Sequence, residues 1–266
     1  MSKKLFIFDT NNNLMELSKT LAQQLAKLSH KKFREREGMF LAEGLKCVGD
    51  MLPSYNLVYL IVSPEFSNNR MAWEVDPEKI LIAGSDLIKK ISSLQSPPEV
   101  IGVFEIPSDK NDIPKINKTG LYLLIDGVQD PGNVGTLIRT ADWFGITTVF
   151  LSEDSADIFN AKTIQATMGS LARVKTVRCD LERLINLNPD MPVIGTLLEG
   201  DSIYTSSTPQ SGFVVMGSEG HGISEKIKQK ISLPLYIPPY NKTSHPDSLN
   251  VGVACGIVLS FIRSNR

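Results

Sequence analysis

Five polar residues of this sequence stand where a folded chain could use them for chemistry. They lie in turns or at expected helix starts: Asn133, Arg139, Glu219, Ser248 and Asn250. Arg139 lies about a turn and a half into an expected helix, and an arginine held near a strand end can bind phosphate through its planar guanidinium. Asn133 stands where the N-cap of that helix is expected. Alternatively, Asn133 only caps the helix and Arg139 only reaches solvent.

Glu219 stands in the glycine-rich segment VVMGSEGHGIS. Gly217, Gly220 and Gly222 surround it, and glycines let the backbone approach a ligand closely. A tight turn ahead of a helix expected near Ser224 would explain the glycines without any ligand. It would not explain the glutamate.

The segment from Leu233 to Ile262 predicts a short strand, a proline-rich polar loop and a helix that begins near Ser248. Apolar residues cover most of the helix circumference, so this helix is expected to be buried nearly all round. Ser248 is expected to cap it, with free backbone N–H groups directed into the loop. Such a helix start could hold a small ligand, although an ordinary C-terminal core helix would show the same pattern.

Composition narrows the class of protein. The chain has 266 residues, enough for one large or two modest domains, and its 42% hydrophobic content is enough for a core. A net charge of -1 argues against binding a polyanion through bulk charge but allows a local basic patch. Three widely separated cysteines and three scattered histidines predict no metal site and no disulfide framework.

Both ends of the sequence lack a long apolar run. The run after MSKK is too short for the core of a signal peptide, and the C-terminal run is too short and too interrupted by glycine to span a bilayer. A reduced, cytoplasmic protein is therefore expected.

The N-terminal part alternates helix and strand. Leucines at helical spacing predict a helix from Leu14 to about Gly38, and FLAEGLKCVGDML (Phe40–Leu52) predicts a second helix. Three short apolar runs predict strands: Leu57–Val62, Ile80–Gly84 and Val100–Ile106. These elements form a small α/β unit.

The second half of the first helix is basic, with five cations: Lys27, Lys31, Lys32, Arg34 and Arg36. Two interpretations remain open. The cations form a strip that binds phosphates, or they form an ordinary solvated face.

Residues 107–120 read as a linker, because two prolines and lysine-flanked turns replace any periodicity. Beyond them strands and helices alternate to the C-terminus, which predicts a mostly parallel sheet covered on both faces. Ligand-binding loops in such sheets lie at the carboxyl ends of the strands. The segment GNVG lacks the third glycine and the acidic residue of a dinucleotide site, so NAD binding is rejected.

Three segments together resemble a known family. QDPGNVGTLIRTADWFG, VMGSEGHGIS and IPP…SLNVGVACGIVLSF look like the three motifs of the SpoU (TrmH) branch of the SPOUT RNA methyltransferases, in the family's order. The region from Phe40 to Ile106, with Phe40, Glu43 and Gly44 in an FxxEG element, is similar to the substrate-binding domain of the ribosomal-RNA members. The resemblance divides the chain into residues 1–106 (N-terminal helix and RNA substrate-binding domain), the linker 107–120 and a methyltransferase domain, 121–266.

The resemblance implies an α/β catalytic domain with a deep trefoil knot, which is an exception to the rule that chains do not knot. It implies an S-adenosylmethionine pocket within the knot, a homodimer and methyl transfer to a ribose 2′-hydroxyl of RNA. The implied catalytic residues are the five polar residues named first. The implied cofactor-binding residues act mainly through backbone: Thr196, Leu197, Gly217, Ile237 and Leu249.

A ribose hydroxyl is a poor nucleophile, and its proton must leave as the methyl group arrives. His221 is the one histidine in these motifs, so there is no clear imidazole base. We expect Arg139 to bind phosphate and stabilise the developing alkoxide, with Glu219 orienting Arg139 and Asn133.

One segment departs from the family pattern. The connection PPYNKTSHPD (Pro238–Asp247) is longer than the family's and lacks its glycine, which leaves the contacts of this loop open. Two other functions also remain open: a transfer-RNA methyltransferase of the same family, and a non-catalytic RNA-binding or ribosome assembly factor. The separate N-terminal domain favours ribosomal RNA, and the intact motif residues argue against the non-catalytic factor.

Overall fold

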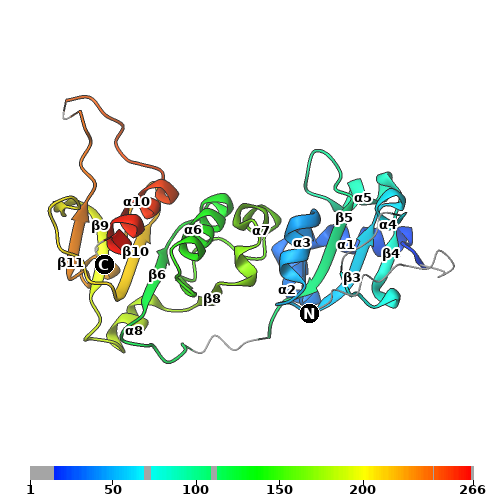
Figure 1. Ribbon diagram of the computed structural model, residues 1–266, viewed down its shortest axis with the longest axis horizontal. Coiled ribbons are helices and arrows are strands. Elements are labelled where there is room, and N and C mark those ends of the chain that lie inside the picture. Colours follow the sequence, from blue (N-terminus) through cyan, green and yellow to red (C-terminus); the bar gives the residue numbers. More distant parts are fainter. Residues whose placement is uncertain (1–14, 69–72, 109–112, 242, 265–266) are drawn as a thin grey trace, which may run out of the picture. The chain divides into compact units, whose positions relative to one another are not determined.

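The computed structural model describes residues 15–68, 73–108, 113–241 and 243–264. The chain divides into two compact units, each with its own sheet (Figure 1): the described residues of Met1–Ser108 with Phe159–Ala172, and those of Asp109–Ile158 with Arg173–Arg266. No sequence pattern indicated that 159–172 would join the first unit. Leu14 of the predicted first helix and residues 109–112 of the predicted linker lie outside the described ranges.

The first unit contains a five-stranded sheet in the order β1-β4-β3-β5-β2. Its strands are β1 (Met15–Glu16), β2 (Met39–Glu43), β3 (Leu57–Val62), β4 (Ile80–Ile82) and β5 (Val100–Glu105). Strand β5 runs antiparallel to β2 and β3, whereas β4 runs parallel to β1 and β3. The predicted strands β3, β4 and β5 are confirmed.

Helices cover both faces of this sheet. They are α1 (Lys19–Ala26), α2 (Lys31–Glu37), α3 (Leu45–Met51), α4 (Pro64–Asn68), α5 (Ser85–Ile91) and α7 (Ala161–Thr167), with 3₁₀ turns at Lys27–Ser29, Pro77–Lys79 and Ser170–Ala172. On one face Leu25 of α1 and Ile88 of α5 share a core with Ile61 and Ile101. On the other face, the ring centroids of Phe40 and Phe159 lie 4.8 Å apart.

Two element predictions in this unit are wrong. The helix predicted from Leu14 to about Gly38 starts late, because Met15–Glu16 form strand β1 and Ser18 caps α1. It is also broken at His30, whose extended backbone (φ -98°, ψ 133°) separates the 3₁₀ turn from α2. The helix predicted from Phe40 begins instead as strand β2, because Phe40 and Ala42 are buried in the sheet beside β5. Gly44, with φ 89°, ends the strand and starts α3.

The second unit contains the predicted parallel sheet, and here the prediction is confirmed. All neighbouring strands run parallel in the order β11-β9-β10-β6-β7-β8. The strands are β6 (Leu121–Asp126), β7 (Thr148–Leu151), β8 (Lys175–Arg178), β9 (Val193–Ser202), β10 (Gly212–Gly217) and β11 (Leu233–Tyr236). Since all strands point the same way, the loops that leave them gather at one edge of the sheet.

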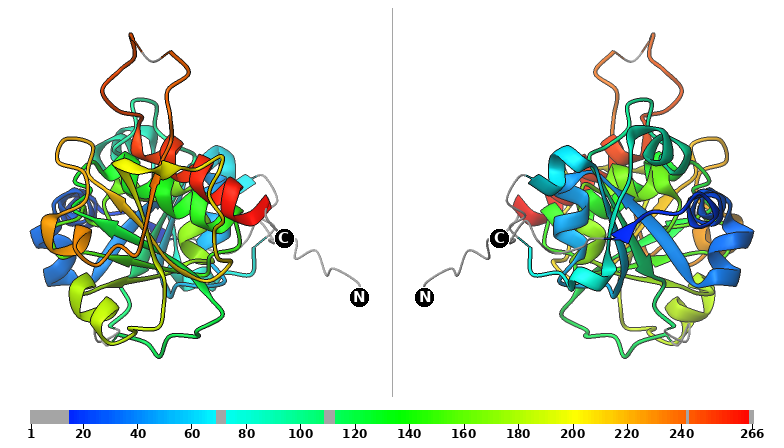
Figure 2. Two further views of the ribbon diagram at one scale, coloured as in Figure 1. Left: turned by 90° about the vertical axis from the view of Figure 1, so that its left-hand side faces the viewer. Right: turned by 90° about the vertical axis from the view of Figure 1, so that its right-hand side faces the viewer.

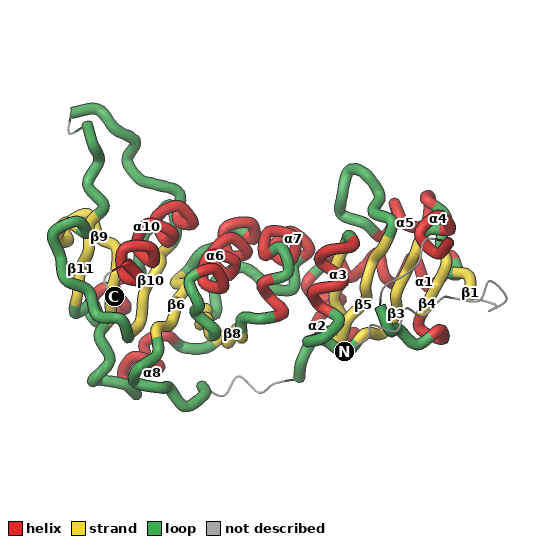
Figure 3. The backbone as a smooth tube through the Cα atoms, viewed as in Figure 1, coloured by secondary structure: helices red, strands yellow, loops and turns green. Residues whose placement is uncertain are grey.

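Helices α6 (Pro131–Trp143) and α10 (Val251–Ser264) lie on one face of this sheet, and α8 (Leu181–Asn186) lies on the other (Figures 1 and 3). Helix α9 (Glu225–Lys228) shares a core cluster with α8 on that second face. Alternate strand residues such as Leu124, Phe213 and Val215 pack with α8 and α9. Helices α6 and α10 run parallel, because Asn250 contacts Asn133 where they start and Arg263 Nε donates to Phe144 O at 3.0 Å where they end.

The starts of these two helices differ from the prediction. Asp130, not Asn133, caps α6: its Oδ1 accepts from Asn133 N at 2.9 Å, and Pro131 takes the first helical position. Asn250, not Ser248, caps α10, because its Oδ1 accepts from Gly252 N at 3.0 Å. Asn250 is therefore a structural residue as well as a candidate for chemistry.

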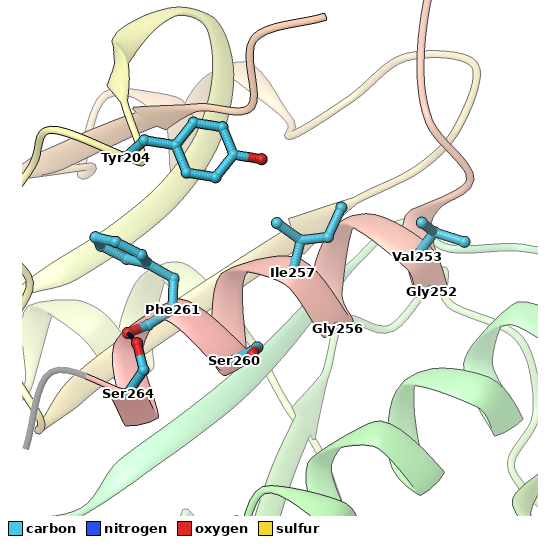
Figure 4. A pocket seen from close by; sticks show the side chains of 8 residues that line it. All are labelled: Tyr204, Gly252, Val253, Gly256, Ile257, Ser260, Phe261 and Ser264. Atoms are coloured by element: carbon cyan, nitrogen blue, oxygen red, sulfur yellow. Dashed lines mark hydrogen bonds between the residues drawn. The ribbon is translucent and has the colours of Figure 1, made fainter. Parts of the chain in front are cut away.

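Helix α10 is also less buried than predicted. One of its faces is open, with Val253 54% exposed, and lines a shallow hollow of about 500 Å³ beside Tyr204 (Figure 4). Among the described residues, no helix combines the length and apolar character needed to cross a membrane.

Candidate active site

A cavity of about 710 Å³ lies at the carboxyl edge of the parallel sheet, where β9, β10 and β11 meet the start of α10. All five residues predicted to bind the cofactor line it: Thr196, Leu197, Gly217, Ile237 and Leu249. Glu219 and Ser248, both predicted to be catalytic, line it as well. The fold therefore brings residues that are up to 53 positions apart in the sequence (196 to 249) to one cavity.

A hydrogen-bonded cluster of Asn133, Glu219 and Asn250 joins the three predicted motifs. Asn250 Nδ2 donates to Asn133 Oδ1 at 3.1 Å and to Glu219 Oε1 at 2.7 Å. Asn250 is the centre of this cluster, because its other amide atom caps α10. One side chain thus holds the first turn of α6, the turn after β10 and the start of the last helix together.

Arg139 lies outside this cluster. Its side chain is exposed on α6, and within the described part of the chain it makes no hydrogen bond or ion pair. Glu219 contacts Asn250 rather than Arg139, so the expected orientation of Arg139 by Glu219 does not occur in this chain as described. Ser248 lines the cavity, but within the described chain no hydrogen bond joins it to the cluster.

A second cavity of about 410 Å³ lies beside the loop after β6. It shares the turn Ser218–Gly222 with the first cavity, and Asn133 and Glu219 both line it. The cluster therefore borders both cavities.

Sequence reasoning missed Asp126, which lies at the end of β6 with 3% of its surface exposed. Its Oδ2 accepts from Ser224 N at 2.7 Å and so ties the end of β6 to the segment after β10. The available signal was a carboxylate that ends the otherwise apolar run LYLLID. A buried carboxylate that accepts a backbone hydrogen bond fixes the loop it faces.

The SpoU rRNA Methylase family matches residues 120–260, more than half of the chain. The chain belongs to the SpoU rRNA methylase family. The family of MRM3-like substrate binding domains matches residues 20–102, which lie in the first unit.

Relatives match this member of the SpoU family over most of its length. The 23S rRNA (guanosine(2553)-2′-O)-methyltransferase RlmP of Bacillus subtilis is 32% identical over 89% of this chain and 93% of its own length. A TrmH-family structure from Porphyromonas gingivalis is 36% identical with a TM-score of 0.82, covering 94% of this chain and 99% of that one. The AdoMet-bound rRNA methyltransferase of Sinorhizobium meliloti is 28% identical with a TM-score of 0.80, covering 94% of this chain and 96% of that one.

The glycines of the second SpoU motif close its turn. A Cβ atom on Gly217 would lie 2.2 Å from the carbonyl carbon of Gly222, and Gly222 itself has φ 67°. Ser218 and Gly222 exchange two backbone hydrogen bonds, at 2.9 and 2.8 Å. These glycines are therefore explained by turn closure, and Glu219 at the tip is the residue that the turn presents.

The segment Thr196–Gly200 is not the separate loop that was expected after a strand. Strand β9 continues to Ser202, and its pairing with β11 jumps from Gly195 to Asp201. Residues 196–200 therefore bulge out of the strand, and this bulge brings Thr196 and Leu197 to the cavity.

The connection Pro238–Asp247, here called the arm, projects from its unit as an extended loop (Figures 1 and 2). Its two ends line the larger cavity through Pro238, Pro239, His245 and Pro246. Residue 242 of the arm lies outside the described ranges. The connection that was expected to depart from the SpoU pattern thus contributes residues to the lining of the cavity.

The predicted basic strip keeps four of its five residues on the surface. Arg34 is 2% exposed and donates to Leu28 O at 2.7 Å and Ser29 O at 2.9 Å, so it fixes the turn before α2 and cannot face RNA. Its assignment to RNA binding is wrong, because a buried guanidinium that satisfies backbone carbonyls serves the fold. Lys27 and Arg36 lie over the ring of Phe33, at 5.7 and 4.8 Å from its centroid.

The thiols are protected by burial. Burial raises the pKa of Cys255 to about 12 and is the largest cause that raises the pKa values of Cys47 and Cys179 to about 11. In the described chain no group of three or more potential ligands is arranged for a metal ion.

Proposed function

We propose that this protein transfers the methyl group of S-adenosylmethionine to a ribose 2′-hydroxyl of ribosomal RNA. The observation that carries the proposal is the hydrogen-bonded cluster of Asn133, Glu219 and Asn250 at the edge of the cavity. The relatives support the choice of RNA, since those from Bacillus subtilis and Streptomyces viridochromogenes are named for 2′-O-methylation of guanosine and of uridine in 23S rRNA.

The larger cavity fits the cofactor. Its volume of about 710 Å³ lies in the range of about 300–1,000 Å³ that small-molecule sites occupy. Gly217, Ile237 and Leu249 would hold S-adenosylmethionine mainly through backbone groups, with Thr196 and Leu197 also in the lining of the cavity. When bound there, the cofactor supplies a methyl group on a sulfonium sulfur.

The chain's own residues position the hydroxyl and stabilise its charge. The amides of Asn133 and Asn250 and the carboxylate of Glu219 form one fixed polar surface, with Ser248 beside it in the cavity wall. Arg139, exposed and unbonded within the described chain, binds the RNA phosphate next to the target ribose and stabilises the developing alkoxide.

The first unit binds the RNA around the target. Lys27, Lys31, Lys32 and Arg36 contact its phosphates. The functional domains are residues 1–106 for substrate binding and 121–266 for methyl transfer, joined by 107–120, and the family matches to 20–102 and 120–260 support these bounds. The protein works in the cytoplasm, where its ribosomal RNA is assembled.

The open face of α10 pairs with a second copy of the chain. Val253, Ile257 and Phe261 present apolar surface beside Gly256, where the absence of a side chain permits close approach (Figure 4). The chain from β11 through the arm to α10 forms the trefoil knot around the cavity. Val253→Glu is expected to give a monomer by light scattering, whereas Leu187→Glu, at an exposed position after α8, leaves a dimer. A wild-type monomer would refute the dimer.

The decisive test is methyl transfer from radiolabelled S-adenosylmethionine to unmodified ribosomal RNA transcribed in vitro, with transfer RNA as a second substrate. We expect label in ribosomal RNA, at a ribose that becomes resistant to alkaline cleavage. Calorimetry is expected to show binding of S-adenosylmethionine without RNA. Cofactor binding without transfer to any RNA, or label on a base, would refute the proposal.

A further inference from the structure

The arm, Pro238–Asp247, projects away from the rest of its unit (Figures 1 and 2). The side chain of Tyr240 is fully exposed, and Asn241 and residues 243–247 are exposed as well. Within the described arm no backbone group forms a hydrogen bond to another backbone group of the chain. Because the arm buries so little, its apolar tyrosine contributes little to the stability of this unit.

Parts of the arm are nevertheless restricted in conformation. Pro238, Pro239 and Pro246 restrict its backbone, and at its tip the N–H and Oγ1 of Thr243 both donate to Asn241 Oδ1, at 3.0 and 2.9 Å. A stiff segment loses less conformational entropy when it binds a partner. The smaller loss of conformational entropy favours a role in recognition over a role as a loose connection.

We propose that the arm is an RNA-recognition element in which Tyr240 stacks on an unpaired base next to the methylated nucleotide. The inference rests on the proposed function, since it uses the RNA that this function requires. Pro239 and Tyr240 at one end of the arm and Pro246 at the other line the cavity. Any nucleotide whose ribose reaches that cavity therefore lies within reach of the arm.

The chemistry of the arm fits a base better than a phosphate. The arm contains an aromatic ring, an amide, hydroxyl groups and one imidazole, and its single lysine (Lys242) and single carboxylate (Asp247) leave it with no net charge to attract phosphate. Tyrosine is suited to stacking because its rigid ring gives a large contact at low entropic cost. The stacked base is single-stranded, since bases in an RNA duplex do not expose their faces.

The test compares Tyr240→Ala with Tyr240→Phe, using in vitro transcribed, unmodified 23S rRNA as the probe. Removing one aromatic ring from under a base should weaken RNA binding about 5- to 150-fold. We expect the alanine variant to raise the KM for RNA, and its Kd in filter binding, by that factor with little change in kcat. Tyr240→Phe keeps the ring and should behave as wild type. The matched control is Leu187→Ala, which removes another exposed apolar side chain of the same unit.

Two further measurements separate the possible occupants of the arm. Affinity for S-adenosylmethionine by calorimetry and molecular mass by light scattering should be the same in Tyr240→Ala as in wild type. A loss of cofactor affinity would show that the arm covers the cofactor, and a loss of dimers would show that it grips a second copy; either result overturns the inference. Unchanged RNA affinity would overturn it too. Filter binding needs no turnover, so the two proposals can fail separately. RNA affinity could be unchanged in Tyr240→Ala while methyl transfer persists, and RNA affinity could fall in Tyr240→Ala although no methyl transfer is found.

Discussion

Asn250 makes four hydrogen bonds through one amide, and Asn250→Ala removes all of them. Two of these bonds cap α10, and losing a cap of this kind costs about 1 kcal/mol. The two bonds to Asn133 and Glu219 join partly or fully exposed groups, so together they add about 1 kcal/mol. A total of roughly 2 kcal/mol should lower the Tm by about 4–8 °C in a chain of this size.

The variant Asn250→Asp distinguishes the effect of the helix cap from the effect of the hydrogen-bonded cluster. Aspartate caps a helix about as well as asparagine, so the bonds to Gly252 and Val253 should persist. It offers no donor to Asn133, and it sets a second carboxylate beside Glu219, where Asn250 Nδ2 now lies 2.7 Å from Oε1. The cluster is therefore broken in both variants, whereas the cap is lost only in the alanine variant.

The assay measures kcat/KM for methyl transfer at saturating S-adenosylmethionine, together with the Tm of each variant. Misplacement of a catalytic group by about 1 Å can cost about 100-fold in rate, so both variants should lose on the order of 100-fold in kcat/KM. Their Tm values should differ, with the aspartate variant closer to wild type. The reasoning is refuted if the aspartate variant turns over at the wild-type rate. It is also refuted if kcat/KM falls in each variant only in proportion to the loss of Tm.

Three other perturbations test the remaining assignments. Arg139→Ala should abolish methylation with cofactor affinity unchanged by calorimetry; near-native turnover would end the assignment. Reversing Lys31 and Lys32 to Glu should weaken RNA binding and reduce the slope of log K against log[salt] by about two, and an unchanged slope would identify a solvated face. The buried Cys255 thiol, whose pKa is raised to about 12, stays protonated below that pH and should react with Ellman's reagent at pH 8 only after unfolding. Labelling of the native protein at that residue would contradict its burial.

The second unit could be predicted well from the sequence because its strands are buried on both faces. Such strands appear as continuous apolar runs, and LYLLID coincides with β6 at both ends. The parallel order followed from the alternation of strands with helices, and the position of the candidate site followed from the edge at which parallel strands end. Glu219 and Asn250 came together as expected because their loops leave that same edge.

The first unit was harder because its strand β2 depends on a distant partner. Phe40 pairs with Phe104, and no local pattern in FLAEG distinguishes a strand from the start of a helix. Arg34 was misassigned for a similar reason. Its carbonyl acceptors exist only because the chain turns at Leu28 and Ser29, and a charge count cannot show that turn.

The cluster also shows why three short motifs far apart in the chain behave as one site. Strands β6 and β10 are neighbours, and their last residues, Asp126 and Gly217, are paired in register. Asp126 then holds Ser224 on the far side of the glycine-rich turn, while Asn250 holds Glu219 at its tip. The glycine-rich turn is therefore held both at Ser224 and at Glu219, and Asn250, which holds Glu219, is also the residue that starts α10. Formation of the last helix and orientation of Glu219 are therefore one structural event, so the polar surface is complete only when the C-terminal segment has folded against the sheet.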